Sequence, residues 1–288
     1  MAQGQSPTVR RRRLAAELRR IREQRGLTID QVSERMAWHP TKLSRIETGR
    51  RSAPPGDVRA LLELYEIAGD EADTLRRLAR QARQRGWWEA YKDVLPPVYS
   101  TYIGLEAEAV SVRNYECLFI PGLLQTENYA RAAIRGVLPQ ATEEDVDSRV
   151  AVRMGRTRLL YSGSLHLWAI MDEAAIRRCV GGPTVMMEQA QHIKELAALP
   201  TVTVQVIPYS AGAHPGMPGS FSILEFPDKT DPEVVYIDSA AGDLFMEREE
   251  EVARYTVTFE HLRAAALSPA DSIQLIMSAV LDSQEVGT

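Results

Sequence analysis

The stretch that most limits how this chain can fold is residues 27–49, which reads as two short helices joined by a tight turn. Thr28 is placed to cap the first helix, and Gln31, three residues later, completes a capping box. Pro40 is pre-organised for the first position of the second helix. Gly49 is suited to ending that helix, because glycine readily adopts a left-handed backbone. Two short helices with this spacing are typical of a helix-turn-helix.

The second of these helices has one apolar face. Leu43 and Ile46 lie three positions apart and share it, while the polar side chains point elsewhere: Thr41, Lys42 and Arg45. In the turn, Ala37 is small where two crossing helices would come close. The pattern predicts a recognition helix that enters the major groove of DNA.

The division of charge along the chain supports this hypothesis better than the total charge does. The whole chain carries a formal net charge of −5, which alone argues against nucleic acid as a partner. Residues 1–85, however, carry +8, with 19 Lys and Arg against 11 Asp and Glu, and residues 86–288 carry −13. A basic N-terminal part releases counterions from phosphates and binds DNA with salt-sensitive affinity. The arginine run 10–13 reads in isolation as a solvated tail, but beside a recognition helix it favours DNA.

Residues 10–85, and the run 43–49 above all, resemble the Cro/repressor-like (XRE) helix-turn-helix family. The resemblance implies an ion pair between Glu47 and Arg22 of the first helix. Ile29 stands where the family often has a phosphate-contacting glutamine, and His39 where a serine is usual. Since histidine is a poor N-cap, His39 is expected to touch a phosphate instead. The whole set expected to contact DNA is Arg45, Lys42, Thr41, Pro40, His39, Thr28, Arg50, Arg51, Arg10, Arg11, Arg12 and Arg13.

Length and composition predict two domains. The chain has 288 residues, 44% of them hydrophobic and 25% charged, as in ordinary globular proteins. An all-α, five-helix domain is expected over 1–85, with Leu14, Leu18 and Ile21 on its first helix and its last helix over about 71–85. Two adjacent tryptophans at 87–88 follow, as structural anchors or as a stacking platform for bases.

Residues 86–288 are predicted to form a mixed α/β (α+β) domain with a partly antiparallel sheet. Helical patterns cover 105–117, 126–137, 143–161, 185–199, 249–267 and 270–281. Strand patterns cover 165–171, 202–207, 221–226 and 234–237. No helical pattern separates the last three strands, so at least part of the sheet is expected to be antiparallel.

Several motifs of this second domain carry a further resemblance. They lie at 115–130, 181–183, 200–208 and 212–216. They resemble the C-terminal domain of unknown function, often labelled antitoxin-like, of XRE regulators from spore-forming soil bacteria. The resemblance implies a small partner protein and a role in development.

The chemistry of an enzyme, a cofactor or a metal is not evident in the sequence. Cys117 and Cys179 lack metal-ligand spacing, the five histidines are scattered, and no phosphate-binding loop or nucleophile motif occurs. The glycine- and proline-rich loop 209–219, with Tyr209 and His214, is a candidate ligand site, although a hairpin loop with a hydrogen-bonded histidine is the simpler interpretation. No cofactor and no catalytic residue is therefore expected.

Two charged groups in the second domain are candidates for partner binding. Arg149, Arg153 and Arg156 share a helical face that is expected to be a solvated stripe. Glu247, Glu249, Glu250 and Glu251 can attract a basic partner or simply begin a helix, where carboxylates favour the dipole.

The sequence thus favours a cytoplasmic, nucleoid-associated transcription regulator without a membrane segment. It is expected to bind double-stranded DNA at a palindromic operator as a homodimer, while the C-terminal domain binds a small protein or ligand. The alternative is an enzyme, or an enzyme remnant, tethered to DNA, with a nucleotide or small-molecule site in the C-terminal domain.

Overall fold

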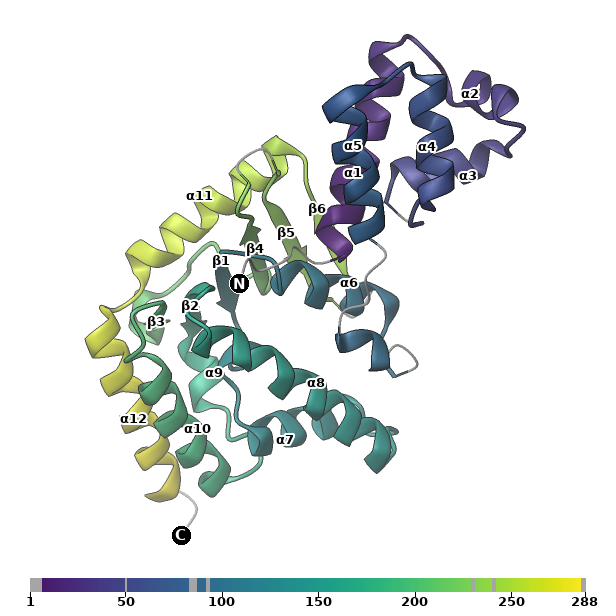
Figure 1. Cartoon of the computed structure of the whole chain (residues 1–288). Helices are drawn as coiled ribbons and strands as arrows, with labels where there is room; N and C mark the ends of the chain where they lie inside the picture. Colours follow the sequence, from purple (N-terminus) through teal and green to yellow (C-terminus); the bar gives the residue numbers. More distant parts are fainter. Residues whose placement is uncertain are drawn as a thin grey trace. The chain divides into compact units, whose positions relative to one another are not determined.

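The computed structural model describes residues 7–49, 51–82, 87–91, 94–228, 231–239 and 242–285. The chain divides into two compact units, Met1–Ala90 and Tyr91–Thr288. Each unit has its own hydrophobic core. Figure 1 shows the helices α1–α5 of the first unit and the sheet and helices of the second.

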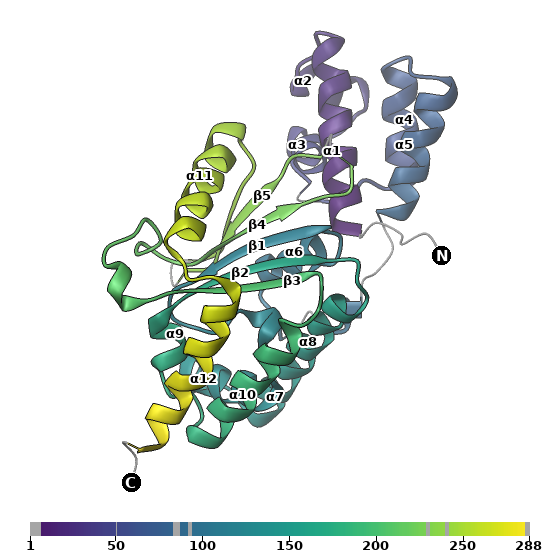
Figure 2. The same ribbon diagram turned by 90° about the vertical axis from the view of Figure 1, so that its left-hand side faces the viewer.

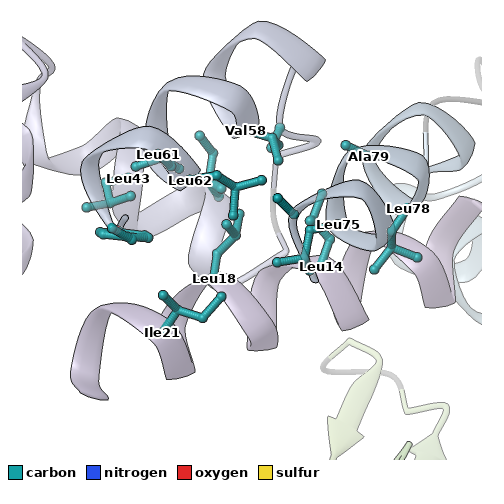
Figure 3. Packing of buried hydrophobic residues seen from close by; sticks show 14 of the residues in the cluster. Leu14, Leu18, Ile21, Leu43, Val58, Leu61, Leu62, Leu75, Leu78 and Ala79 are labelled. Atoms are coloured by element: carbon teal, nitrogen blue, oxygen red, sulfur yellow. The ribbon is translucent and has the colours of Figure 1, made fainter. Parts of the chain in front are cut away.

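The first unit is all-helical, as the sequence predicts. Its helices are α1 (Pro7–Gln24), α2 (Ile29–Arg35), α3 (Pro40–Glu47), α4 (Pro55–Leu64) and α5 (Gly69–Gln81). Figure 3 shows Leu14, Leu18 and Ile21 of α1 among leucines of α3, α4 and α5. A leucine buried to this degree contributes about 1.5–3 kcal/mol to stability. Residues 83–86, at the end of the helix expected over 71–85, lie outside the described residues.

The turn between α2 and α3 holds a difference from the prediction. Ala37 is exposed and has a φ of 52°, in the left-handed region. Its small side chain is therefore not explained by two helices crossing closely. The explanation is the backbone conformation of the turn, which a bulkier or β-branched residue adopts only with strain.

The second unit contains a mixed six-stranded sheet. Its strands are β1 (Ser111–Glu116), β2 (His166–Asp172), β3 (Val202–Ile207), β4 (Phe221–Glu225), β5 (Val234–Ile237) and β6 (Leu244–Met246), in the order β3-β2-β1-β4-β5-β6. The pairs β1–β2 and β2–β3 are parallel, and the remaining three pairs are antiparallel. The expected α/β class with a partly antiparallel sheet is confirmed.

One predicted helix of this unit is wrong. Residues 105–117 do not form a helix: α6 (Pro97–Glu106) ends within this range, and β1 follows it. Strand β1 lies at the centre of the sheet, where Tyr115 pairs with Ile170 on one side and Phe221 on the other. These partners are remote in sequence, so the strand is stabilised by contacts that a local pattern does not contain.

Helices cover both faces of the sheet. They are α7 (Glu127–Val137), α8 (Glu143–Tyr161), α9 (Glu173–Arg177), α10 (Pro183–Leu196), α11 (Glu249–Ala265) and α12 (Pro269–Glu285). Figure 2 shows α11 on one face and the layer of α6–α10 and α12 on the other. Phe259 and Leu262 of α11 are fully buried against Tyr115, Ile170 and Phe221.

Within the described ranges, no single helix has the length and apolar character needed to cross a membrane. Helix α11 and the part of α12 up to Leu281 pass such a test only together, as a pair bent by 72°.

Candidate functional site

The N-terminus of α3 is capped by His39. The Nδ1 atom of His39 accepts a hydrogen bond of 3.2 Å from the backbone N–H of Thr41, and Pro40 occupies the first helical position. The expectation that His39 would not cap the helix is therefore wrong. The tautomer that fits this bond has its proton on Nε2, so Nε2 is left as a donor. The exposed His39 can thus cap the helix and still donate to a phosphate.

Helix α3 presents opposite faces to the core and to solvent. Leu43, Ile46 and Glu47 are buried, whereas Thr41, Arg45 and Thr48 are exposed. The exposed residues are spaced i, i+4 and i+7, so they form one stripe on the side away from the core. A helix with its apolar face anchored and a polar stripe facing outward has the geometry needed to read base edges in a major groove.

Lys42, which is expected on the groove side of the helix, is paired within the first unit. Its Nζ atom lies 2.9 Å from Oδ2 of Asp57 and 3.6 Å from the centroid of the Trp38 ring. Helix α3 therefore carries one exposed cation, Arg45, and one that is held by neighbours, Lys42.

The other residues expected at DNA have different surroundings. The hydroxyl oxygen of Thr28 accepts from the N–H of Gln31 at 3.2 Å, so it is used by the capping box that the sequence predicts. Arg51 is exposed, and Arg50 lies outside the described residues. The run 10–13 is part of α1, not a tail, and Arg10 is only 5% exposed. A guanidinium buried to that degree does not reach a phosphate without moving, so Arg11, Arg12 and Arg13 remain the candidates from this run.

Arg22 and Glu47, which the family resemblance pairs, lie in contact. Nε of Arg22 is 2.8 Å from Oε1 of Glu47, and Nη2 is 2.9 Å from Oε2. Nη1 of Arg22 also donates to the carbonyl of Leu27 at 2.8 Å, which ties the loop before α2 to the same pair. Hydrogen bonding to Glu47 raises the pKa of Arg22. The pair fixes the C-terminal end of α3 to α1.

In the second unit, the loop 209–219 holds a histidine whose two ring nitrogens are both engaged. Nε2 of His214 is 3.0 Å from Oδ2 of Asp172, and Nδ1 accepts from the N–H of Gly216 at 3.3 Å. Gly216 lies against the ring of Tyr115, where an added Cβ would come within 2.5 Å of ring carbons. His214 therefore holds the loop over the ends of β1 and β2. Tyr209 is 60% exposed.

The two charged groups of this unit have different surroundings. Glu249, Glu250 and Glu251 form the first turn of α11, where their charges favour the helix dipole, and Glu247 precedes it on the exposed surface. The arginines of α8 are not a solvated stripe, so that prediction is wrong. They point inward: Arg149 donates to the carbonyl of Val94, Arg153 to Oε1 of Gln125, and Arg156 to Glu106 and Tyr99.

Glu116, at the carboxyl end of β1, is not among the site residues predicted from the sequence. Burial raises the pKa of Glu116 to about 7, and the like charge of Asp238 acts in the same direction. Ser220, Asn114 and Arg153 lower it, and Nδ2 of Asn114 is 3.4 Å from Oε1 of Glu116. The available indication was its place at the end of a strand, but the strand itself was read as a helix.

This environment makes the stability of the second unit depend on pH. The pKa of Glu116 is about 7 in the folded chain against an ordinary 4.5, so the folded state keeps its proton where the unfolded state has lost it. Stability is therefore lost as pH rises from 4.5 to 7, by about 3 kcal/mol in total. We expect Glu116→Gln to remove this loss when urea unfolding is compared at pH 5 and pH 8. Glu225→Gln, at an exposed position of β4, is the control, and an equal pH response of Glu116→Gln and the unaltered chain would contradict the prediction.

Among the described residues, no group of three or more His, Cys, Asp and Glu side chains is arranged to hold a metal ion.

Comparison with protein families gives two matches. Residues 13–75 match the family described as "Helix-turn-helix domain". Residues 99–278 match the family described as "Domain of unknown function (DUF5753)". No curated protein matches the chain significantly, and no solved structure does.

Proposed function

The chain belongs to the DUF5753 family, and we propose that this member is a sequence-specific, DNA-binding transcription regulator of the XRE type. One observation carries the proposal. Within the region that matches a helix-turn-helix domain, the exposed stripe Thr41, Arg45 and Thr48 stands opposite a buried face that Glu47 ties to α1. A recognition helix needs both features, because base contacts specify sequence only if the helix is held at a defined angle.

The proposal is tested by finding the chain's operator and measuring Arg45→Ala on it. Genome-wide mapping of bound sites supplies the operator, and binding is then measured on that duplex and on a scrambled one at fixed salt. Arginine pairs with the O6 and N7 atoms of guanine, and losing such a contact costs about 1–3 kcal/mol, or about 5- to 150-fold in affinity. Arg45→Ala should also relax the preference at one base position. Arg80→Ala, which removes an exposed arginine from α5, is the control for charge alone. Unchanged operator selectivity in Arg45→Ala would refute the assignment of α3.

A homodimer on a palindromic operator is part of the same proposal. One recognition helix of eight residues covers only a few base pairs, so two half-sites about one DNA turn apart are needed for a specific site. Analytical ultracentrifugation with the operator duplex should show two chains per duplex. One chain per duplex, with a monomer at micromolar concentration, would contradict it.

We also propose that the second unit is a binding module for a small protein or ligand, without catalytic turnover. Its negative charge suits a basic protein, and complementary charge speeds and selects association more than it adds affinity. The engagement of both ring nitrogens of His214 argues against a free general base there. The glutamates of the first turn of α11 are the surface to change. Reversal of Glu249, Glu250 and Glu251 to lysine should slow partner binding while DNA binding persists, with the partner identified by co-purification.

A further inference from the structure

The recognition helix carries two cations, Arg45 and Lys42, whose surroundings differ. The Arg45 side chain is exposed and takes part in none of the described hydrogen bonds or ion pairs, whereas Lys42 makes an ion pair at 2.9 Å and lies 3.6 Å above the Trp38 ring. The side chains of Lys42 and Asp57 are 25% and 20% exposed, so their ion pair is partly shielded from water and salt. An ammonium group placed over an indole face and beside a carboxylate has its charge satisfied from two directions.

The position of Lys42 separates it from the stripe that faces outward. On α3, the buried residues Leu43 and Ile46 define one side, and Thr41 and Arg45 define the opposite side. At 100° per residue, Lys42 lies about a quarter-turn from either side, on the flank towards α4. The three linked residues come from three segments, because Trp38 belongs to the turn before α3 and Asp57 to the first turn of α4.

Asp57 lies where a helix favours a carboxylate. It lies at the third position of α4, a helix whose N-cap residue, Pro54, has no side chain that can accept from the first amides. A carboxylate at such a position is stabilised by the positive end of the helix dipole. The acceptor of Lys42 is therefore fixed by its own helix as well as by the ion pair.

We infer that the ion pair with Asp57 keeps Lys42 from contacting DNA. Lys42 then positions the recognition helix against α4, and of Thr41, Lys42 and Arg45 only Thr41 and Arg45 read the groove. The inference rests on the proposed function. A lysine whose charge is paired with a carboxylate of the protein releases no counterion from a phosphate. It therefore adds nothing to the part of DNA binding that is independent of sequence. The Lys42–Asp57 pair raises selectivity because it lowers the affinity for non-specific DNA, while Lys42 still holds the helix in place.

The test is the salt dependence of DNA binding by the full chain, measured on the operator duplex and on a scrambled duplex. Each phosphate contact contributes about 0.9 to the slope of log Kobs against log salt concentration. Lys42→Met keeps the aliphatic stem and should leave the slope unchanged on both duplexes. Asp57→Asn should free Lys42, steepen the slope by about one and strengthen binding to the scrambled duplex several-fold.

Two further variants make the result specific. Arg51→Met removes an exposed cation just after α3 and should make the slope shallower by about one, which calibrates the assay. The double variant Lys42→Met/Asp57→Asn should return to the slope of the unaltered chain, because the effect of Asp57→Asn acts through Lys42. Hydrogen exchange of the α3 and α4 amides reports whether each variant keeps its fold.

A Lys42→Met slope that is shallower by about one would overturn the inference, since Lys42 would then leave Asp57 and contact a phosphate in the complex. An unchanged slope in Asp57→Asn would overturn it as well. With selective binding retained, either outcome leaves the proposed regulator standing. Absence of selective DNA binding in the unaltered chain would instead overturn the proposed function, and this inference with it.

Discussion

Glu47→Ala is expected to destabilise the first unit by about 3–5 kcal/mol, because it leaves a buried guanidinium without its carboxylate. The side chains of Arg22 and Glu47 are only 9% and 3% exposed, and hydrogen bonds from both Nε and Nη2 of Arg22 join them. Hydrogen exchange of the α1 and α3 amides in the full chain measures the loss as a lower free energy of opening. DNA affinity should fall in parallel, since the pair holds the end of the recognition helix.

The matched control lies on the same helix. Glu17 pairs with Arg20 at 2.9 Å, but these side chains are 37% and 45% exposed. Glu17→Ala should cost less than about 1 kcal/mol, because surface pairs are screened by water and salt. A double change of Arg22 and Glu47 to methionine should recover part of the loss, since no unpaired charge is then buried. Equal effects of Glu47→Ala and Glu17→Ala would show that burial of the pair does not matter.

Arg156→Met is expected to destabilise the second unit by a similar amount, about 3–5 kcal/mol. The Glu106 side chain is 0% exposed, and Nε and Nη2 of Arg156 each lie 2.7 Å from one of its oxygens. Without Arg156, its remaining partner among the described contacts is the hydroxyl of Tyr102, at 2.9 Å. Hydrogen exchange of the α6 and α8 amides should show the loss at the two helices that the pair joins.

Two variants keep this prediction testable even if Arg156→Met does not fold. Arg158→Met removes an exposed arginine from the same helix and should change stability by less than about 0.5 kcal/mol. Arg156→Met/Glu106→Leu removes both charges and should be more stable than Arg156→Met alone. If the double variant is no more stable than the single one, the unpaired Glu106 is not the cause of the loss.

The helices of the first unit were predictable because their determinants are local. Thr28 and Gln31 cap α2 across three residues, Pro40 begins α3, and a short apolar period marks the buried side of each helix. The pairing of Arg22 with Glu47 came from a family resemblance and not from spacing. The capping role of His39 was missed because histidine seldom caps helices, although Nδ1 can accept when it is unprotonated.

The second unit shows where local pattern fails. Strands β2–β5 were expected because apolar residues alternate or cluster in short runs between turns, whereas β1 was read as a helix. Strand β1 is paired on both sides with segments about 55 and 110 positions away, and these partners decide its conformation. The inward orientation of Arg156 had one local indication, since it lies four residues from the buried Val152 and Leu160 on α8.

By itself, the sequence determined that a basic helix-turn-helix precedes an acidic α/β domain, because capping, periodicity and charge are properties of neighbouring residues. Only the tertiary structure decided which charges are exposed and which are paired. Lys42 is held by Asp57, fifteen positions on, and Arg156 by Glu106, fifty positions back. Such partners meet only after the helices pack, and burial then strengthens the attraction between charges that water would otherwise screen. The same residue type is therefore an exposed cation at Arg45 and a structural one at Arg156.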